Sequence, residues 1–70
     1  MNIKIEAIKK LMQDKCNGNY NAFARETGIN VALLYRLLNK QAQAGLKTVN
    51  ILIDYLKKNG LKVEEYIFLP

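Results

Sequence analysis

Apolar residues recur at three- and four-residue spacing along most of the chain, which is the period of an amphipathic helix. The first such stretch predicts a helix over residues 2–15. Its inward positions are Ile5, Ile8, Leu11 and Met12. The Asn-Gly-Asn sequence at 17–19 ends this helix, because Asn and Gly tolerate the left-handed backbone of a helix stop.

Two short helices are predicted next, over residues 20–27 and 31–39. Asn19 and Asn30 precede them, and both are of the type that caps a helix by accepting from a backbone N–H. Gly28 lies between them and enters positive φ at no steric cost. The side chains expected to face inward are Phe23, Ala24, Leu34, Leu37 and Leu38.

A fourth helix is predicted over residues 46–58, and Asn59-Gly60 ends it. Its expected core stripe is Leu46, Val49, Leu52, Ile53 and Leu56. The tail, residues 61–70, fits either one or two further helical turns or a short strand, since Tyr, Ile, Phe and Leu in sequence favour a strand. We therefore expect one all-α domain over residues 1–70, with four helices and a fifth short element.

The amino-acid composition excludes several classes of function. Seventy residues allow one small domain, and 11 basic against 6 acidic residues give a net charge of +5. No histidine and a single cysteine, Cys16, argue against His-dependent catalysis, zinc chemistry and an intrachain disulfide. No nucleophile has a base beside it, so we expect no enzyme, no metal and no cofactor. Without a long apolar run or a signal-peptide core, a cytoplasmic protein without membrane contact is expected.

Residues 19–39 have the spacing of a helix-turn-helix, two short helices joined by a turn of three or four residues that contains Gly. Around this stretch the chain resembles the lambda-repressor-like (Cro or XRE) family of small helix-turn-helix proteins, from about Ile8 to Phe68. Four motifs in order carry the resemblance: Ile8-Lys9-Lys10-Leu11, Phe23-Ala24-Arg25-Glu26-Thr27-Gly28-Ile29-Asn30, Leu34-Tyr35-Arg36-Leu37 and Leu46-Lys47-Thr48-Val49-Asn50-Ile51-Leu52-Ile53.

The resemblance implies a compact five-helix domain that binds duplex DNA, usually as a dimer on a pseudo-palindromic operator. By position, the candidates for contacts with base edges are Val31, Ala32, Leu33, Tyr35 and Arg36. The candidates for contacts with phosphates are Asn19, Tyr20, Asn21, Asn30, Asn39, Lys40, Gln43 and Lys47. Residues 19–21 begin a helix, where free backbone N–H groups favour an anion.

Two departures from the family pattern matter. Many members carry an Arg at the position of Met12 and a Glu at the position of Leu38, which form a largely buried ion pair. Two packed apolar groups can replace such a pair at little cost in stability. The second departure is the apolar run from Val31 to Leu33, which can contact a thymine methyl but cannot read hydrogen bonds. Arg36 and Tyr35 would then provide most of the direct readout.

A homodimer is expected through apolar residues off the core stripe. The candidates are Ile51, Tyr55, Tyr66, Phe68 and Leu69. The tail that carries the last three either folds back on the core or is buried in a partner subunit.

Two functions from different classes remain. The first is a sequence-specific regulator that binds double-stranded DNA, of the kind that represses a mobile element's own genes. The alternative keeps the fold and makes it a protein-interaction module, an antitoxin, inhibitor or adaptor, because the apolar Val31–Leu33 stretch also suits a protein groove.

Overall fold

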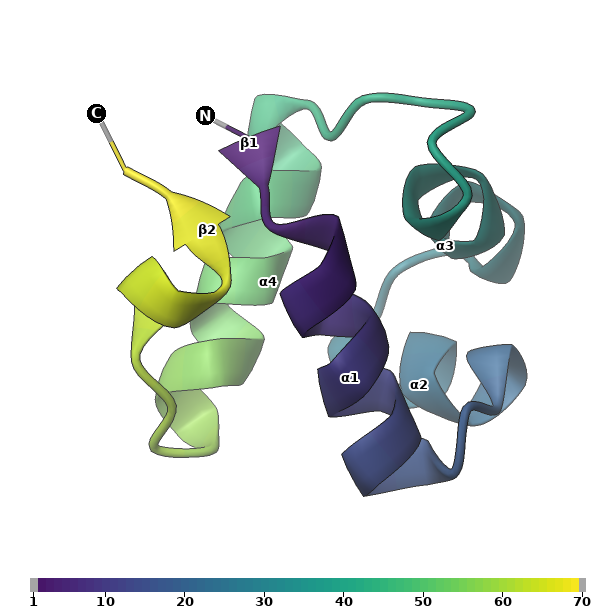
Figure 1. Cartoon of the computed structure of the whole chain (residues 1–70), viewed down its shortest axis with the longest axis horizontal. Helices are drawn as coiled ribbons and strands as arrows, with labels where there is room; N and C mark the ends of the chain where they lie inside the picture. The colour runs from purple at the N-terminus through teal and green to yellow at the C-terminus, as the bar shows by residue number, and fades with distance from the viewer. Residues whose placement is uncertain (1, 70) are drawn as a thin grey trace.

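Four α-helices and a short antiparallel strand pair make up residues 2–69, the part of the chain that the computed structural model describes (Figure 1). In chain order the elements are β1 Asn2–Ile3, α1 Ile5–Cys16, α2 Tyr20–Thr27, α3 Val31–Leu38, α4 Leu46–Lys58, a 3-10 turn Val63–Glu65, and β2 Ile67–Phe68. They form a compact all-α domain of four helices, as the sequence predicts.

Both predicted asparagine caps are confirmed. Asn19 Oδ1 accepts from the Ala22 N–H at 3.1 Å, at the start of α2. Asn30 Oδ1 accepts from the N–H groups of Ala32 and Leu33 at 2.9 and 3.3 Å, at the start of α3. Gly28 ends α2 at φ 85°, which lets the chain turn between the two helices within three residues.

The two ends of the described chain pair with one another, and this overturns one prediction. Residues 2 and 3 are a strand and not the start of a helix, so α1 begins at Ile5. Ile3 pairs with Ile67, and the Lys4 N–H donates to the Tyr66 carbonyl at 2.7 Å. This pairing supplies backbone hydrogen bonds to both ends and buries Ile67 completely. A fifth α-helix, expected from the resemblance, is absent from the described residues, where the 3-10 turn and β2 follow α4 instead.

The core lies where the four helices meet. It contains Met12 and Leu38, which are 5% and 0% exposed. Leu46 was expected in the core and is 70% exposed, because it is the first residue of α4 and its side chain points back beyond the helix end. The buried hydrophobic residues are Ile3, Ile8, Leu11, Met12, Cys16, Phe23, Ala24, Ile29, Leu34, Leu37, Leu38, Val49, Leu52, Tyr55, Leu56 and Ile67.

The Glu26 carboxylate joins three helices. It accepts from Cys16 Sγ of α1 at 3.2 Å and from the Tyr55 hydroxyl of α4 at 3.1 Å, while the Tyr55 ring packs edge-on against Phe23. Burial raises the pKa of Tyr55 to about 12, and the nearby carboxylate adds to this shift. The same two causes raise the pKa of Cys16. Local spacing around Cys16 indicates no charged partner for it, yet the Glu26 carboxylate takes that place and holds α2 against α1 and α4.

Residues 2–69 contain no helix that is both long enough and apolar enough to cross a membrane. Nor do these residues bring together three or more His, Cys, Asp or Glu side chains in a group that could hold a metal ion.

Candidate nucleic-acid interface

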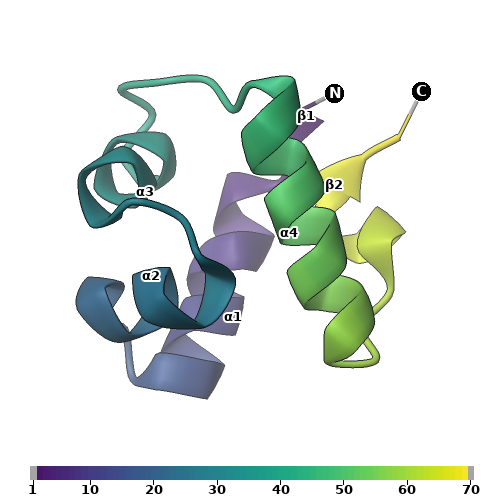
Figure 2. The same ribbon diagram turned by 180° about the vertical axis from the view of Figure 1, so that it is seen from behind.

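The α2–α3 pair lies at the edge of the domain away from the terminal strands, as the two opposite views agree (Figures 1 and 2). Both helices pack against α1, and α2 also contacts α4. Residues 28–30 connect them, with Ile29 buried beneath the turn. The rest of the fold therefore holds this pair rigidly while leaving the outer side of α3 open.

Most of the candidate base-contact residues share one exposed face of α3. Val31, Ala32, Tyr35 and Arg36 are exposed, while positions 34, 37 and 38 are buried on the opposite face. The spacing of the exposed residues, i, i+1, i+4 and i+5, is that of a single helical stripe. Leu33 differs: it is half-buried and packs against the core, so it offers only its edge to a ligand.

Tyr20, Tyr35 and Asn39 form a cluster that ties the start of α2 to the last turn of α3. The two tyrosine rings are 5.3 Å apart between centroids and inclined at 54°. Asn39 Nδ2 donates to the Tyr20 hydroxyl at 3.3 Å and to the Tyr35 carbonyl at 2.8 Å. The structure thus brings two predicted phosphate-contact residues against one predicted base-contact residue.

The start of α2 retains free donors for an anion. The Asn19 cap takes the Ala22 N–H, which leaves the Tyr20 and Asn21 N–H groups without an intrahelical partner. At α3 the Asn30 cap takes two N–H groups, so Asn30 itself can offer a ligand only its Nδ2. The first turn of α2 is consequently the better of the two anion sites.

The remaining phosphate candidates follow α3. Lys40, Gln43 and Lys47 are exposed in the loop that leads to α4 and at the first turn of that helix. Lys40 adopts φ 60°, a left-handed conformation that is uncommon for any residue except Gly, Asn and Asp.

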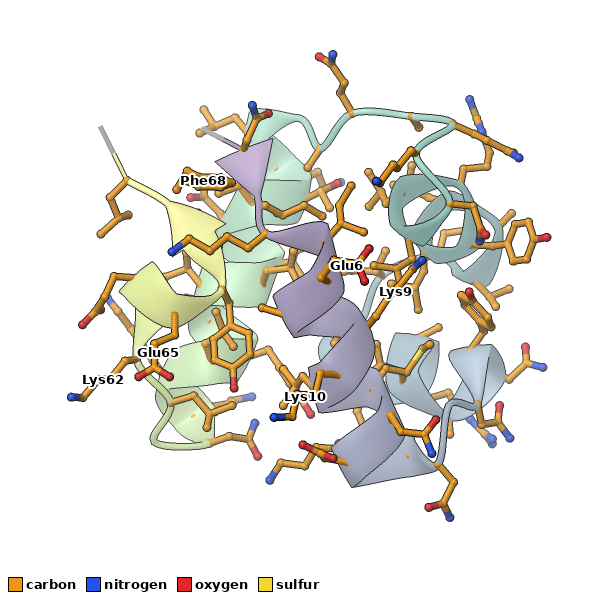
Figure 3. The ribbon with its side chains drawn as sticks, viewed as in Figure 1. Glu6, Lys9, Lys10, Lys62, Glu65 and Phe68 are labelled. Carbon is orange, nitrogen blue, oxygen red and sulfur yellow. The ribbon has the colours of Figure 1, made fainter. Side chains whose placement is uncertain are left out.

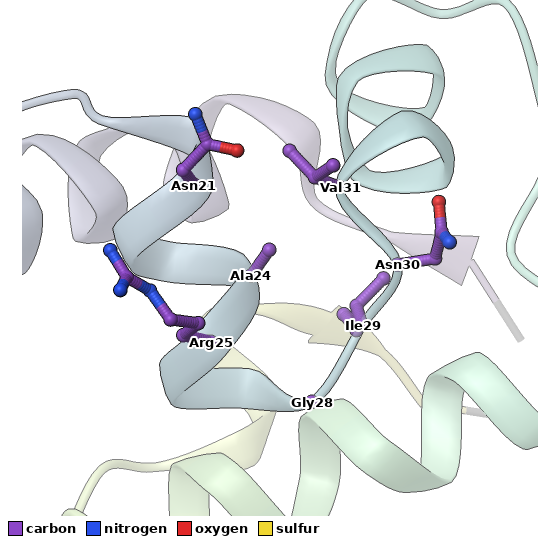
Figure 4. A pocket seen from close by; sticks show the side chains of 7 residues that line it. All are labelled: Asn21, Ala24, Arg25, Gly28, Ile29, Asn30 and Val31. Carbon is purple, nitrogen blue, oxygen red and sulfur yellow. The ribbon is translucent and has the colours of Figure 1, made fainter.

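An open depression between α2 and α3 adds a residue that the sequence analysis missed. Asn21 from α2 and Val31 from α3 face each other across it, and Arg25 lies one turn after Asn21 (Figure 4). Asn30 also lines it. The spacing i, i+4 from Asn21 is the signal that could have identified Arg25.

The predicted interface residues fall into three groups. Tyr55 is 6% exposed and its hydroxyl is bonded to Glu26, so it has little surface to offer to a partner. Ile51 and Tyr66 are half-buried. Phe68 and Leu69, 57% and 52% exposed, leave open apolar surface at the end of β2. The tail was expected either to fold back on the core or to be buried in a partner subunit. Ile67 folds back on the core, whereas Phe68 and Leu69 stay outside it.

Chemically, the exposed side of the α2–α3 pair offers hydrogen-bond donors and positive charge from both helices, beside small apolar groups at the start of α3. Guanidinium and backbone N–H groups suit phosphate oxygens and the acceptors on base edges. Comparisons of the chain with the models of known families, with curated proteins and with solved structures found no match.

Proposed function

We propose that this protein is a sequence-specific, duplex-DNA-binding transcriptional regulator of the lambda-repressor-like type. In this reading α2 and α3 are a helix-turn-helix and α3 is the recognition helix. One observation carries the proposal: α3 presents a single exposed stripe ending in Arg36, beside an α2 N-terminus whose first residue packs on Tyr35. That arrangement offers donors to base edges and to the adjacent phosphate at the same time.

The chemistry of each contact follows from its side chain. The Arg36 guanidinium would donate to guanine O6 and N7, worth about 1–3 kcal/mol of discrimination between bases. Val31 and Ala32 would contact thymine methyl groups. The Tyr20 and Asn21 N–H groups, with Lys40 and the other loop donors, would hold the sugar–phosphate backbone and fix the register of α3 in the groove.

Two copies would act together on DNA. Phe68 and Leu69 are the exposed apolar residues that support a homodimer, and a two-fold dimer implies a pseudo-palindromic operator. Its half-sites would lie about 34 Å, one helical turn, apart. Occupying such a site would repress the gene that overlaps it.

The same stripe also supports the second candidate, a protein-interaction module. Arg36 is the one charged residue on the exposed face of α3, and Val31 is 38% exposed at its start. Exposed apolar side chains at the start of a helix fit a groove on another protein. This function predicts sensitivity at Val31 and Leu33, with little response to DNA.

In vitro selection from a random duplex pool separates these functions. Wild type and Arg36→Ala are run in parallel, with Lys57→Ala as a control that removes a charge at the far end of α4. Enrichment of a two-fold-symmetric motif by wild type and Lys57→Ala, lost or relaxed with Arg36→Ala, is the expected result. Weak, salt-sensitive retention of the pool without enrichment would overturn the regulator and favour the protein module.

A further inference from the structure

A groove joins the start of α1 to the turn that follows α3. Two of the residues that line it are basic, Lys4 and Lys40, although they lie far apart in the sequence. Its other lining residues are Ile3, Ile5, Glu6 and Phe68. A neighbouring hollow shares Phe68 and reaches Gln43, so the loop after α3 lies against the terminal strand pair. The groove thus begins where the candidate DNA-contact surface of α3 ends.

Lys4 is held in place at one side of this groove. Its ammonium donates to the Glu64 carbonyl at 2.8 Å and lies 5.1 Å from the centre of the Phe68 ring. An ammonium has three donors, and within residues 2–69 only this one is used. The remaining donors belong to a cation whose position is already fixed, which lowers the entropy cost of binding an anion.

Lys40 lies in a backbone position that glycine normally takes. After α3, the Gln41 N–H donates to the Arg36 carbonyl and the Lys40 N–H to the Leu37 carbonyl, which is a Schellman turn with Lys40 at its left-handed position. The same two bonds end α4, where Leu61 and Gly60 donate and Gly60 takes φ 68°. A lysine kept where the fold favours glycine is an outlier that points to a role for its side chain.

The charges of the lining residues determine which kind of ligand the groove favours. Glu6 is the acidic side chain among the lining residues, and Lys9 follows it one turn later on α1 (Figure 3). Lys4 and Lys40 therefore leave the groove with an excess of positive charge above an apolar floor of Ile3, Ile5 and Phe68.

We infer that this groove binds a backbone phosphate of duplex DNA, with Lys4 and Lys40 among its lining residues supplying the positive charge. The inference rests on the proposed function and extends its footprint beyond α3 to the start of α1. It makes Lys4, outside the helix pair, a nucleic-acid contact. It also explains why the turn after α3 carries a lysine: the side chain adds affinity at some expense of stability.

The test measures how affinity for DNA falls with salt. The probe is a labelled mixed-sequence duplex of roughly 20 base pairs, about two helical turns. The variants are Lys4→Met, which keeps an unbranched stem over Phe68, and Lys40→Gly. Lys57→Met is the matched control, because it removes the same charge from the end of α4 distant from the groove (Figure 1).

Lys4→Met and Lys40→Gly are each expected to reduce the slope of log K against log salt by about 0.9, the value for one phosphate contact. Lys57→Met should leave the slope unchanged. Lys40→Gly should also raise the melting temperature by about 4 °C, so that its lost affinity cannot be assigned to unfolding.

Two results would overturn this inference, and they are distinguishable. If wild type binds the duplex and Lys4→Met has the same salt slope as Lys57→Met, the groove is not a phosphate site, although DNA binding stands. If wild type itself retains no duplex at low salt, the proposed function fails and the groove inference fails with it. A Lys40→Gly variant that is less stable than wild type would remove the argument from the Schellman turn.

Discussion

The ring of Tyr20, the first residue of α2, packs on the ring of Tyr35 in α3 with 5.3 Å between their centroids. This contact sets the position of an exposed side chain on α3. We expect Tyr20→Ala and Tyr35→Ala to be coupled by about 0.5–1.5 kcal/mol in a double-mutant cycle of urea unfolding, as for other aromatic pairs. Additive effects of the two substitutions would mean that the rings do not stabilise the helix pair.

The raised pKa of Tyr55, caused first by burial and then by the hydrogen bond to Glu26, predicts that the protein loses stability at alkaline pH. The folded protein raises the pKa of Tyr55 to about 12, from the ordinary value of 10.0. The free energy of unfolding is therefore unaffected by this group below pH 10. It falls between about pH 10 and 12, where the unfolded chain has already lost the proton, by on the order of 2 kcal/mol in total. Denaturant unfolding across this range checks the slope.

The variant Glu26→Gln shows how much of the raised pKa of Tyr55 comes from the Glu26 carboxylate. We expect the variant to lower the pKa of Tyr55, though not to its ordinary value, because burial is the larger cause and remains. Absorbance of tyrosinate against pH measures this, with Tyr55→Phe to assign the transition. Glu65→Gln, an exposed carboxylate elsewhere, is the control. A Tyr55 titration identical in wild type and Glu26→Gln would contradict the assignment.

Gly60 offers a stability test of the Schellman turn itself. Its φ is 68°, and a Cβ built on it would meet no atom within 4 Å, so any penalty comes from the backbone conformation alone. We expect Gly60→Ala to lower the free energy of unfolding by about 1 kcal/mol. Gly45→Ala is the matched control, because Gly45 has equally open surroundings and no positive φ. Equal losses for both variants would rule out the backbone explanation.

The exposed end of β2 predicts self-association. Phe68→Glu combined with Leu69→Glu is expected to convert a wild-type dimer into a monomer in sedimentation equilibrium at high micromolar concentration, since buried carboxylates oppose association. Leu46→Glu, at an apolar position that is even more exposed, should leave the dimer intact. Monomeric wild type would refute the dimer. Shortening the chain to Glu65 is a poorer test, because it also removes the buried Ile67.

The helices, their caps and most of the core could be read from the sequence. Apolar spacing located α2 to within its observed bounds, and Asn19 and Asn30 act as the caps that their residue types indicate. The burial of Met12 together with Leu38 also follows from local pattern. These features depend on residues close together in the chain, which is why periodicity and capping rules reach them.

Features formed by residues that lie far apart in the sequence could not be predicted from it. The first strand forms only where it meets residues 67 and 68, so local spacing could not distinguish it from a helix start, and Asn2 and Ile3 were misassigned. The strand at residues 67 and 68 was one of the two alternatives that the tail's residue types allowed. The Tyr55–Glu26 bond joins residues 29 positions apart and draws Tyr55 off the surface into the core. Of the candidate site, the exposed stripe of α3 was predictable, but Arg25 and the groove of Lys4 with Lys40 required the packed structure.

The pairing of Ile3 with Ile67 has a consequence for how the chain folds during synthesis. Ile67 is fully buried, and the first strand has no partner until residues 67 and 68 have left the ribosome. All four helices precede residue 67 in the chain, so the core stays open on one side until residues 67 and 68 join it. A chain that ends at residue 66 should accordingly be cut by proteases at sites that the full chain protects.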